Sequence, residues 1–149
     1  MPHTRWGVAS LVVGTVLAGI SLATSSAQTP PTRTINVSIV SYKFDPSLIT
    51  MNAGDRITIQ LSNDDPDKRA HSMASAFFST VDYTVTGNAK QGVAKDGWKY
   101  ILLDAGEKAA VSFVVPANPG QVTFICEQYN HAARGQVGTF VIWPAGYKP

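Results

Sequence analysis

The stretch "FICEQYNHAARGQVGTFVI", residues 124–142, joins two apolar runs through a polar loop. It holds the single cysteine of the chain, Cys126, followed by His131 and Gln136 at the spacing C-x4-H-x4-Q. Free cysteine is among the residue types that are most often buried, so core packing is one interpretation of Cys126. A metal site is the other interpretation, because a thiolate and an imidazole are ligands of soft and borderline metals.

The chain around this stretch reads as short strands between turn signals. In residues 34–42 and 56–62, apolar and polar side chains alternate, which is typical of half-buried strands. Turns containing glycine or proline separate the apolar runs. About seven to eight short strands with little helical periodicity predict an all-β sandwich or barrel. Further strands are expected at 46–51, 81–86, 98–103, 108–115, 121–126 and 137–143, and loops at 63–70 and 87–97.

The first 27 residues are typical of a secretory signal peptide. Arg5 precedes an uncharged apolar run, and small residues follow at Ser25 and Ala27. We predict cleavage after Ala27, which leaves residues 28–149 as a single domain in the periplasm or outside the cell, without stable membrane association. An uncleaved membrane anchor is the alternative.

Charge and cysteine content narrow the class of function. The 149 residues carry 12 Lys and Arg against 10 Asp and Glu, with no basic cluster, which argues against a nucleic-acid binder. A lone cysteine cannot form an internal disulfide, and an idle thiol is a liability in an oxidising compartment. A chemical use of Cys126 is therefore favoured.

Only two histidines, His71 and His131, lie beyond the predicted signal peptide. We expect His71, 55 residues before Cys126, at the end of another strand–loop unit of the sandwich. A blue-copper electron-transfer site consists of a thiolate, two imidazoles and a weak axial donor. The axial donor is a methionine, a glutamine or a backbone oxygen. Zinc uses similar ligands, but a structural zinc site takes four strong donors, and no fourth Cys or His is available.

Three segments resemble the cupredoxins, the small blue-copper proteins that include plastocyanins, azurins and phytocyanins. They are "YKFDPSLITMNAGDRITIQLSN" (42–63), "LLDAGEKAAVSFVVPANPGQVTFIC" (102–126) and "CEQYNHAARGQVGTFVI" (126–142). The resemblance implies a Greek-key β-sandwich over residues 28–149. It also implies one copper ion per chain, cycling between Cu(I) and Cu(II).

The resemblance also implies the ligands. Cys126 takes the place of the thiolate ligand, and His71 and His131 take the places of the imidazole ligands. Gln136 stands where many relatives have methionine, at a spacing similar to that of stellacyanin-type phytocyanins. We therefore expect Gln136 as the axial ligand, with a lower reduction potential than a methionine analogue. Met73, two residues after His71, is expected in the core.

Two regions depart from the family pattern. The loop "NDDPDKRA" (63–70) is longer and more charged than expected, and its charges are interpreted as solvated. Ser72 stands where an asparagine often follows the first histidine, so Ser72 or Asn63 is a candidate for linking the two ligand loops. The resemblance does not cover residues 77–100, whose role it leaves open.

The expected function is one-electron transfer between transient protein partners by a monomer that is not an enzyme. We expect electrons to be exchanged with the partner through His131, which is followed by the apolar residues Ala132 and Ala133. Three positive residues expected nearby favour an acidic partner: Lys68, Arg69 and Arg134. The alternatives are a copper enzyme or nitric-oxide-binding site, a copper carrier or storage protein, and a metal-free β-sandwich interaction module.

Overall fold

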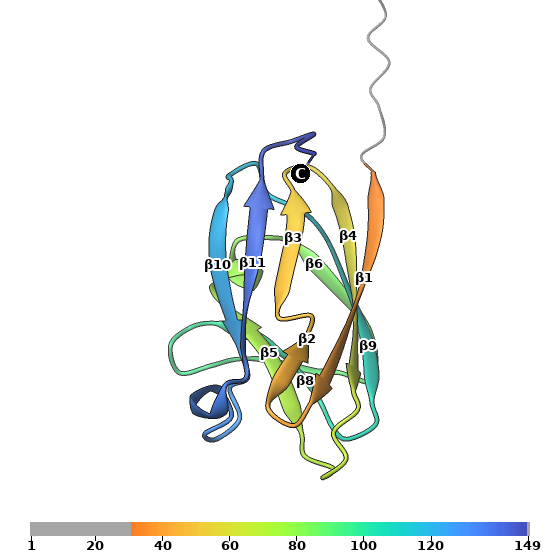
Figure 1. The fold of residues 1–149 in the computed structure, drawn as a ribbon, viewed down its shortest axis with the longest axis vertical. Coiled ribbons are helices and arrows are strands. Elements are labelled where there is room, and N and C mark those ends of the chain that lie inside the picture. The colour runs from red at the N-terminus through yellow and green to blue at the C-terminus, as the bar shows by residue number, and fades with distance from the viewer. Residues whose placement is uncertain (1–30, 149) are drawn as a thin grey trace, which may run out of the picture.

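The computed structural model describes residues 31–148, which form two β-sheets packed face to face (Figure 1). The predicted signal peptide, residues 1–27, lies outside the described residues. No helix in the described part is long and apolar enough to cross a membrane. The strands are β1 (Thr32–Val40), β2 (Lys43–Asp45), β3 (Leu48–Asn52), β4 (Arg56–Asn63), β5 (His71–Ser75), β6 (Tyr83–Gly87), β7 (Lys90–Val93), β8 (Lys99–Leu103), β9 (Lys108–Val114), β10 (Gly120–Ile125) and β11 (Val137–Trp143), with short 3-10 helices η1 (Ala76–Ser79) and η2 (Ala132–Arg134).

The strands are divided between the two sheets in an order that makes distant parts of the sequence neighbours. One sheet has the order β2-β1-β4-β9-β6 and the other β3-β11-β10-β5-β8-β7. β1 pairs with β4, and β11 with β3, in parallel, whereas the remaining pairs are antiparallel. The pairing of β5 with β10 at Ala74 and Ile125 brings the segment of His71 beside the segment of Cys126.

The prediction of an all-β sandwich is confirmed, but the structure has more strands than expected. The additional strands are β2, β5 and β7. The prediction of a loop over residues 87–97 is wrong, because β7 lies within it and pairs with β8. The segment 77–100, whose role was open, supplies β6 and β7, each of which is one of the two edge strands of its sheet.

The core between the sheets is apolar and rich in aromatic rings. Phe124 of β10 and Phe140 of β11 are fully buried, with ring centroids 4.6 Å apart. Phe77 of η1 joins Phe140 to Phe113 of β9, with ring centroids 5.1 Å and 5.0 Å away, respectively. Such tilted and edge-on aromatic pairs stabilise a core beyond their burial alone. Met73 is buried in this core, as expected.

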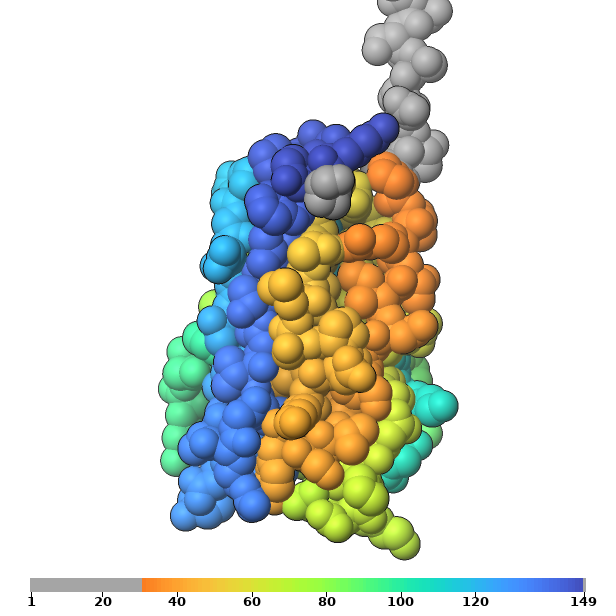
Figure 2. All heavy atoms as spheres, viewed as in Figure 1, coloured from red at the N-terminus to blue at the C-terminus, as the bar shows by residue number. Residues whose placement is uncertain are grey.

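Three loops gather at one end of the sandwich, the lower end in Figures 1 and 2. They are the β1–β2 turn, the β4–β5 loop and the β10–β11 loop, which carries η2 (Figure 1). The space-filling view shows these segments side by side at that end, with the C-terminal residues at the other (Figure 2). The loops therefore place the sequence-predicted site residues at one end of a rigid scaffold.

Candidate metal centre

The β10–β11 loop is closed by its own backbone. The amide of Cys126 donates to the carbonyl of Gln136 at 3.0 Å, and the amide of Gln136 donates to the carbonyl of His131 at 3.1 Å. Gly135 has a φ of 101°, a left-handed conformation that glycine adopts without strain. These contacts fold the C-x4-H-x4-Q stretch back on itself, so that its three side chains lie near one another.

Cys126 is the centre of the cluster. Its side chain is buried, with a relative exposure of 1%, and its Sγ lies 3.4 Å from Nδ1 of His131 and 3.9 Å from Nδ1 of His71. One ligand atom from each of these residues lies within 4.8 Å of the others. Both imidazoles thus present the same ring nitrogen to the sulfur.

His71 reaches the cluster from the other ligand segment. It is the first residue of β5 and directly follows the β4–β5 loop, so it lies at the end of a strand–loop unit, as predicted. All five residues of β5 are buried, and pairing with Leu103 of β8 fixes the backbone of His71. The ring of His71 is fully buried and lies 4.7 Å from the ring of His131, centroid to centroid.

Gln136 completes the group and carries an unusual feature. Its side chain is fully buried, and its Oε1 lies 2.8 Å from Nδ1 of His71. Within residues 31–148, its Nε2 is the one buried side-chain nitrogen or oxygen without a hydrogen-bond partner. Leaving such a group unpaired costs about 1–3 kcal/mol. A polar side chain kept at this cost beside a thiol and two imidazoles fits a metal-binding role.

Ser72 links the two ligand segments, in the role considered for it. Its backbone amide points to Cys126 Sγ at 3.3 Å, and its hydroxyl accepts a hydrogen bond from the amide of Glu127 at 2.9 Å. The two contacts tie β5 to the β10–β11 loop beside the sulfur. Asn63 has a different role, because its side chain donates to the carbonyls of Arg69 and Leu103 and thereby shapes the β4–β5 loop.

The β4–β5 loop contains a buried carboxylate, which contradicts the interpretation of all its charges as solvated. The side chain of Asp65 has no exposed surface, and its Oδ2 lies 2.6 Å from Nε2 of His71. Arg69 Nε donates to the same oxygen at 2.7 Å. The Arg69 guanidinium holds the pKa of Asp65 well below its usual range, although burial opposes the shift.

The two histidines have different electrostatic surroundings. Burial by itself lowers the pKa of His71, but its contacts with Cys126 and Asp65 outweigh burial and raise the pKa. Burial, followed by the neighbouring charge of His71, lowers the pKa of His131. His131 is only half-buried, so it is the edge of the cluster that lies nearest to solvent.

Tyr42, in the β1–β2 turn, covers the histidines from the outside. Its ring meets the ring of His131 edge-on at 4.9 Å. Arg69 and Arg134 lie over the Tyr42 ring at 4.3 and 3.9 Å from its centroid, and both donate to its hydroxyl. Sequence reasoning missed Tyr42 and Asp65, because each reaches the cluster through contacts between loops that are distant in the chain.

Comparisons with known proteins bear on the fold. No family model and no curated protein matches the chain. Among solved structures, dithionite-reduced auracyanin from the photosynthetic bacterium Roseiflexus castenholzii is similar, with 18% identity, coverage of 74% of this chain and 97% of that one, and a TM-score of 0.56. Auracyanin A, a "blue" copper protein from Chloroflexus aurantiacus, has 17% identity, coverage of 74% and 98%, and a TM-score of 0.52.

The chain has the cupredoxin fold. A copper-containing nitrite reductase from Thermus scotoductus contains a similar unit, which matches 75% of this chain but 30% of the reductase, with 14% identity and a TM-score of 0.51. The cupredoxin fold thus occurs both in small proteins and as part of larger enzymes.

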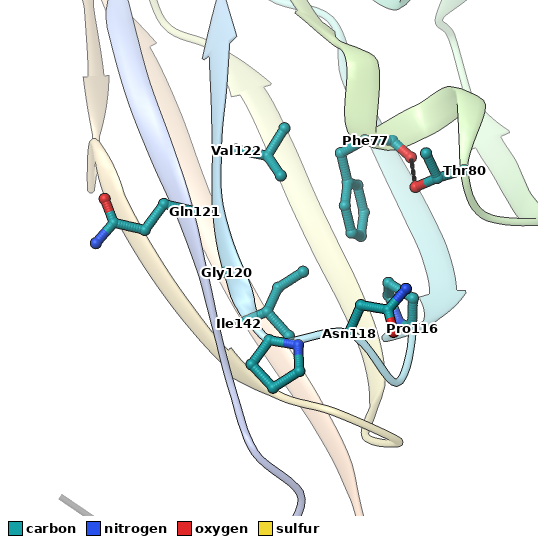
Figure 3. Close-up of a pocket in the computed structure, with 9 residues that line it drawn as sticks. Phe77, Thr80, Pro116, Asn118, Gly120, Gln121, Val122 and Ile142 are labelled. Atoms are coloured by element: carbon teal, nitrogen blue, oxygen red, sulfur yellow. Dashed lines mark hydrogen bonds between the residues drawn. The ribbon is translucent and has the colours of Figure 1, made fainter.

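A surface hollow of about 340 Å³ lies at the other end of β10 (Figure 3). Phe77 and Val122 face it from η1 and β10, and Pro116, Asn118 and Ile142 line it from the strand ends (Figure 3). Its lining contains no His, Cys, Asp or Glu, in contrast to the cluster around Cys126. We therefore place the chemistry of the chain at the loop end and not in this hollow.

Proposed function

We propose that this chain is a type 1 copper protein that carries single electrons between redox partners. The convergence of Cys126 Sγ with Nδ1 of both His71 and His131, beside the buried amide of Gln136, supports the proposal. Cys126, His71 and His131 would hold one copper ion per chain, and the amide oxygen of Gln136 would be a further, weaker donor. When bound, copper supplies a one-electron couple between Cu(I) and Cu(II).

The residues of the chain contribute rigidity and exclusion of water. His71 and Gln136 are fully buried, and Cys126 nearly so, so their positions are set by packing and backbone hydrogen bonds. Ligands that are held in place rearrange little between two oxidation states, which keeps the barrier to electron transfer low. A buried cluster with one half-exposed imidazole suits electron exchange through the edge of His131 better than access of a substrate.

The surface around His131 indicates the kind of partner. Arg69 and Arg134 flank Tyr42 beside His131, and Lys68 is exposed in the same loop as Arg69. We propose that this positive rim favours an acidic redox protein in a small and transient contact. The predicted signal peptide at 1–27 supports a periplasmic or secreted location, where the chain would act as a monomer.

Loading the protein with copper and recording its visible spectrum tests the proposal. We expect one copper per chain and an intense thiolate-to-copper band that disappears in Cys126→Ser. Met73→Leu is the matched control: Met73 lies close to His71 in sequence but packs in the core, and Met-to-Leu exchange conserves volume. This variant should keep the band.

The same measurement separates the alternatives. A colourless protein that takes up no copper contradicts the proposal and favours a metal-free interaction module. A copper spectrum that changes when nitric oxide or another small molecule is added favours an enzyme or a ligand-binding site over a carrier.

A further inference from the structure

We propose that Asp65 is a positioning residue of this site. It holds the imidazole of His71 at Nε2, the ring nitrogen that faces away from Cys126, and it biases the site toward Cu(II). The inference rests on the proposed copper function and deepens it. It assigns a role to a carboxylate that the local sequence places in a solvated loop.

The carboxylate of Asp65 contacts His71, a predicted ligand, on the side of the ring that faces away from Cys126. Its Oδ2 lies 2.6 Å from Nε2 of His71, and neither side chain has exposed surface. The opposite ring nitrogen, Nδ1, faces Cys126 Sγ and Gln136 Oε1. A carboxylate at Nε2 keeps a proton on that nitrogen, which leaves Nδ1 as the nitrogen that binds a metal ion. Asp65 therefore orients the ring and selects its tautomer.

Asp65 is itself held from several directions. Arg69 donates to both carboxylate oxygens, from Nε at 2.7 Å and from Nη2 at 3.0 Å. The amide of Asp67 donates to Oδ1 at 3.0 Å, and the amide of Asp65 donates to Oδ1 of Asn63 at 3.2 Å. A buried charge is tolerated when it is paired and hydrogen-bonded in this way. The carboxylate cannot turn away from His71 without breaking these bonds.

The expected effect on the metal follows from charge. A fixed negative charge in a buried region stabilises the more positive oxidation state, because Coulomb interactions are screened less there than in bulk solvent. Hydrogen bonding from Nε2 to a carboxylate also makes Nδ1 a stronger donor. Both effects favour Cu(II) over Cu(I). A purely structural role for Asp65, in which it only pins the β4–β5 loop through Arg69, predicts neither effect.

The test compares Asp65→Asn with Asp67→Asn in the copper-loaded protein. Asparagine at 65 keeps an oxygen for Nε2 but removes the charge. Asp67 is the matched control: its exposed carboxylate also pairs with Arg69, at 2.6 Å, whereas it is Asp65 that contacts His71. The two readouts are the reduction potential and the coupling of the remote imidazole nitrogens, measured by electron spin echo envelope modulation.

For Asp65→Asn we expect Cu(II) affinity to fall about tenfold, the lower end of the range for such partners of a ligand, with a smaller fall for Cu(I). Each tenfold difference between the two states raises the reduction potential by about 59 mV. The remote-nitrogen coupling of one imidazole should change as well. Asp67→Asn should change neither quantity. Equal effects in both variants, or none in Asp65→Asn, overturn the inference.

A second pair of variants covers the case in which Asp65→Asn does not fold. Arg69→Gln frees Asp65 from its counter-ion, while Arg134→Gln removes the other guanidinium on Tyr42 without touching Asp65. We expect Arg69→Gln to lower the potential more than Arg134→Gln, and equal shifts contradict a role of Asp65. If the unsubstituted protein is colourless after copper loading, both the proposed function and this inference are wrong. If it shows the thiolate-to-copper band but substitution of Asp65 changes neither the reduction potential nor the remote-nitrogen coupling, this inference alone is wrong.

Discussion

Replacing Gln136 by methionine tests the site at its most unusual residue. Gln136 is fully buried, its Oε1 lies 2.8 Å from Nδ1 of His71, and its own Nε2 has no hydrogen-bond partner. Methionine has a similar length and no polar hydrogen. The substitution therefore exchanges a hard amide oxygen for a soft thioether and removes the unpaired donor in one step.

The structure predicts the effect of Gln136→Met on the metal-free protein. Loss of the hydrogen bond to His71 lowers the free energy of unfolding by about 1 kcal/mol, and removal of the unpaired amide raises it by about 1–3 kcal/mol. The metal-free variant should thus be as stable as the unsubstituted protein, or more stable by up to about 2 kcal/mol. Denaturant unfolding of both proteins after copper removal measures this difference.

The copper-loaded variant should respond in its reduction potential. A thioether favours Cu(I), and a tenfold shift in the ratio of the Cu(I) and Cu(II) affinities raises the potential by about 59 mV. Gln128→Met is the control, because Gln128 lies in the same loop and contacts His131 through its backbone carbonyl. If Gln136→Met keeps the thiolate band but leaves the potential unchanged or lowers it, then Gln136 does not bind the metal.

Three further perturbations test the scaffold, the electrostatics and the docking face. Gly138→Ala should lower the free energy of unfolding by about 1–3 kcal/mol, because the added Cβ would lie 2.5 Å from the Ser47 carbonyl and would also meet the ring of Phe124; an unchanged urea midpoint contradicts this packing. Because the pKa of His71 is raised above its ordinary 6.5 and that of Asp65 is lowered below its ordinary 3.8, their contribution to metal-free stability should be present between these values. This contribution should be lost as pH rises through the raised pKa of His71 or falls through the lowered pKa of Asp65, and unfolding titrations across pH measure it. Copper affinity should decrease with acidification because protons compete for the ligands, and competition titrations across pH measure that trend. Arg134→Glu should slow electron transfer to an acidic partner at low salt and have little effect at high salt, and rates independent of ionic strength refute the proposed docking face.

The strands differ in how well their local sequence predicts them. β1, β4 and β9 alternate between buried and exposed positions, so their periodicity is visible in the chain. β5 is buried at every position and therefore shows no alternation, although it carries His71. β7 is a short edge strand with little burial, and only its pairing with β8 defines it.

The candidate site divides in the same way. Cys126, His131 and Gln136 lie within one short loop, so their spacing predicts that they can meet, and the resemblance to cupredoxins names His71 as the fourth member. The amino-acid sequence by itself thus determines an all-β chain and a candidate ligand set, because residue type and periodicity are local properties.

Only the tertiary structure determines what surrounds those ligands. Asp65 lies in a charged loop that resembles any solvated turn, and its burial arises because the β4–β5 connection folds it against His71 and Arg69. Tyr42 likewise contacts His131 only because the β1–β2 turn and the β10–β11 loop meet at one end of the sandwich. Burial, hydrogen bonding and the direction of a pKa shift depend on segments far apart in the chain, so they are set by packing and not by local pattern.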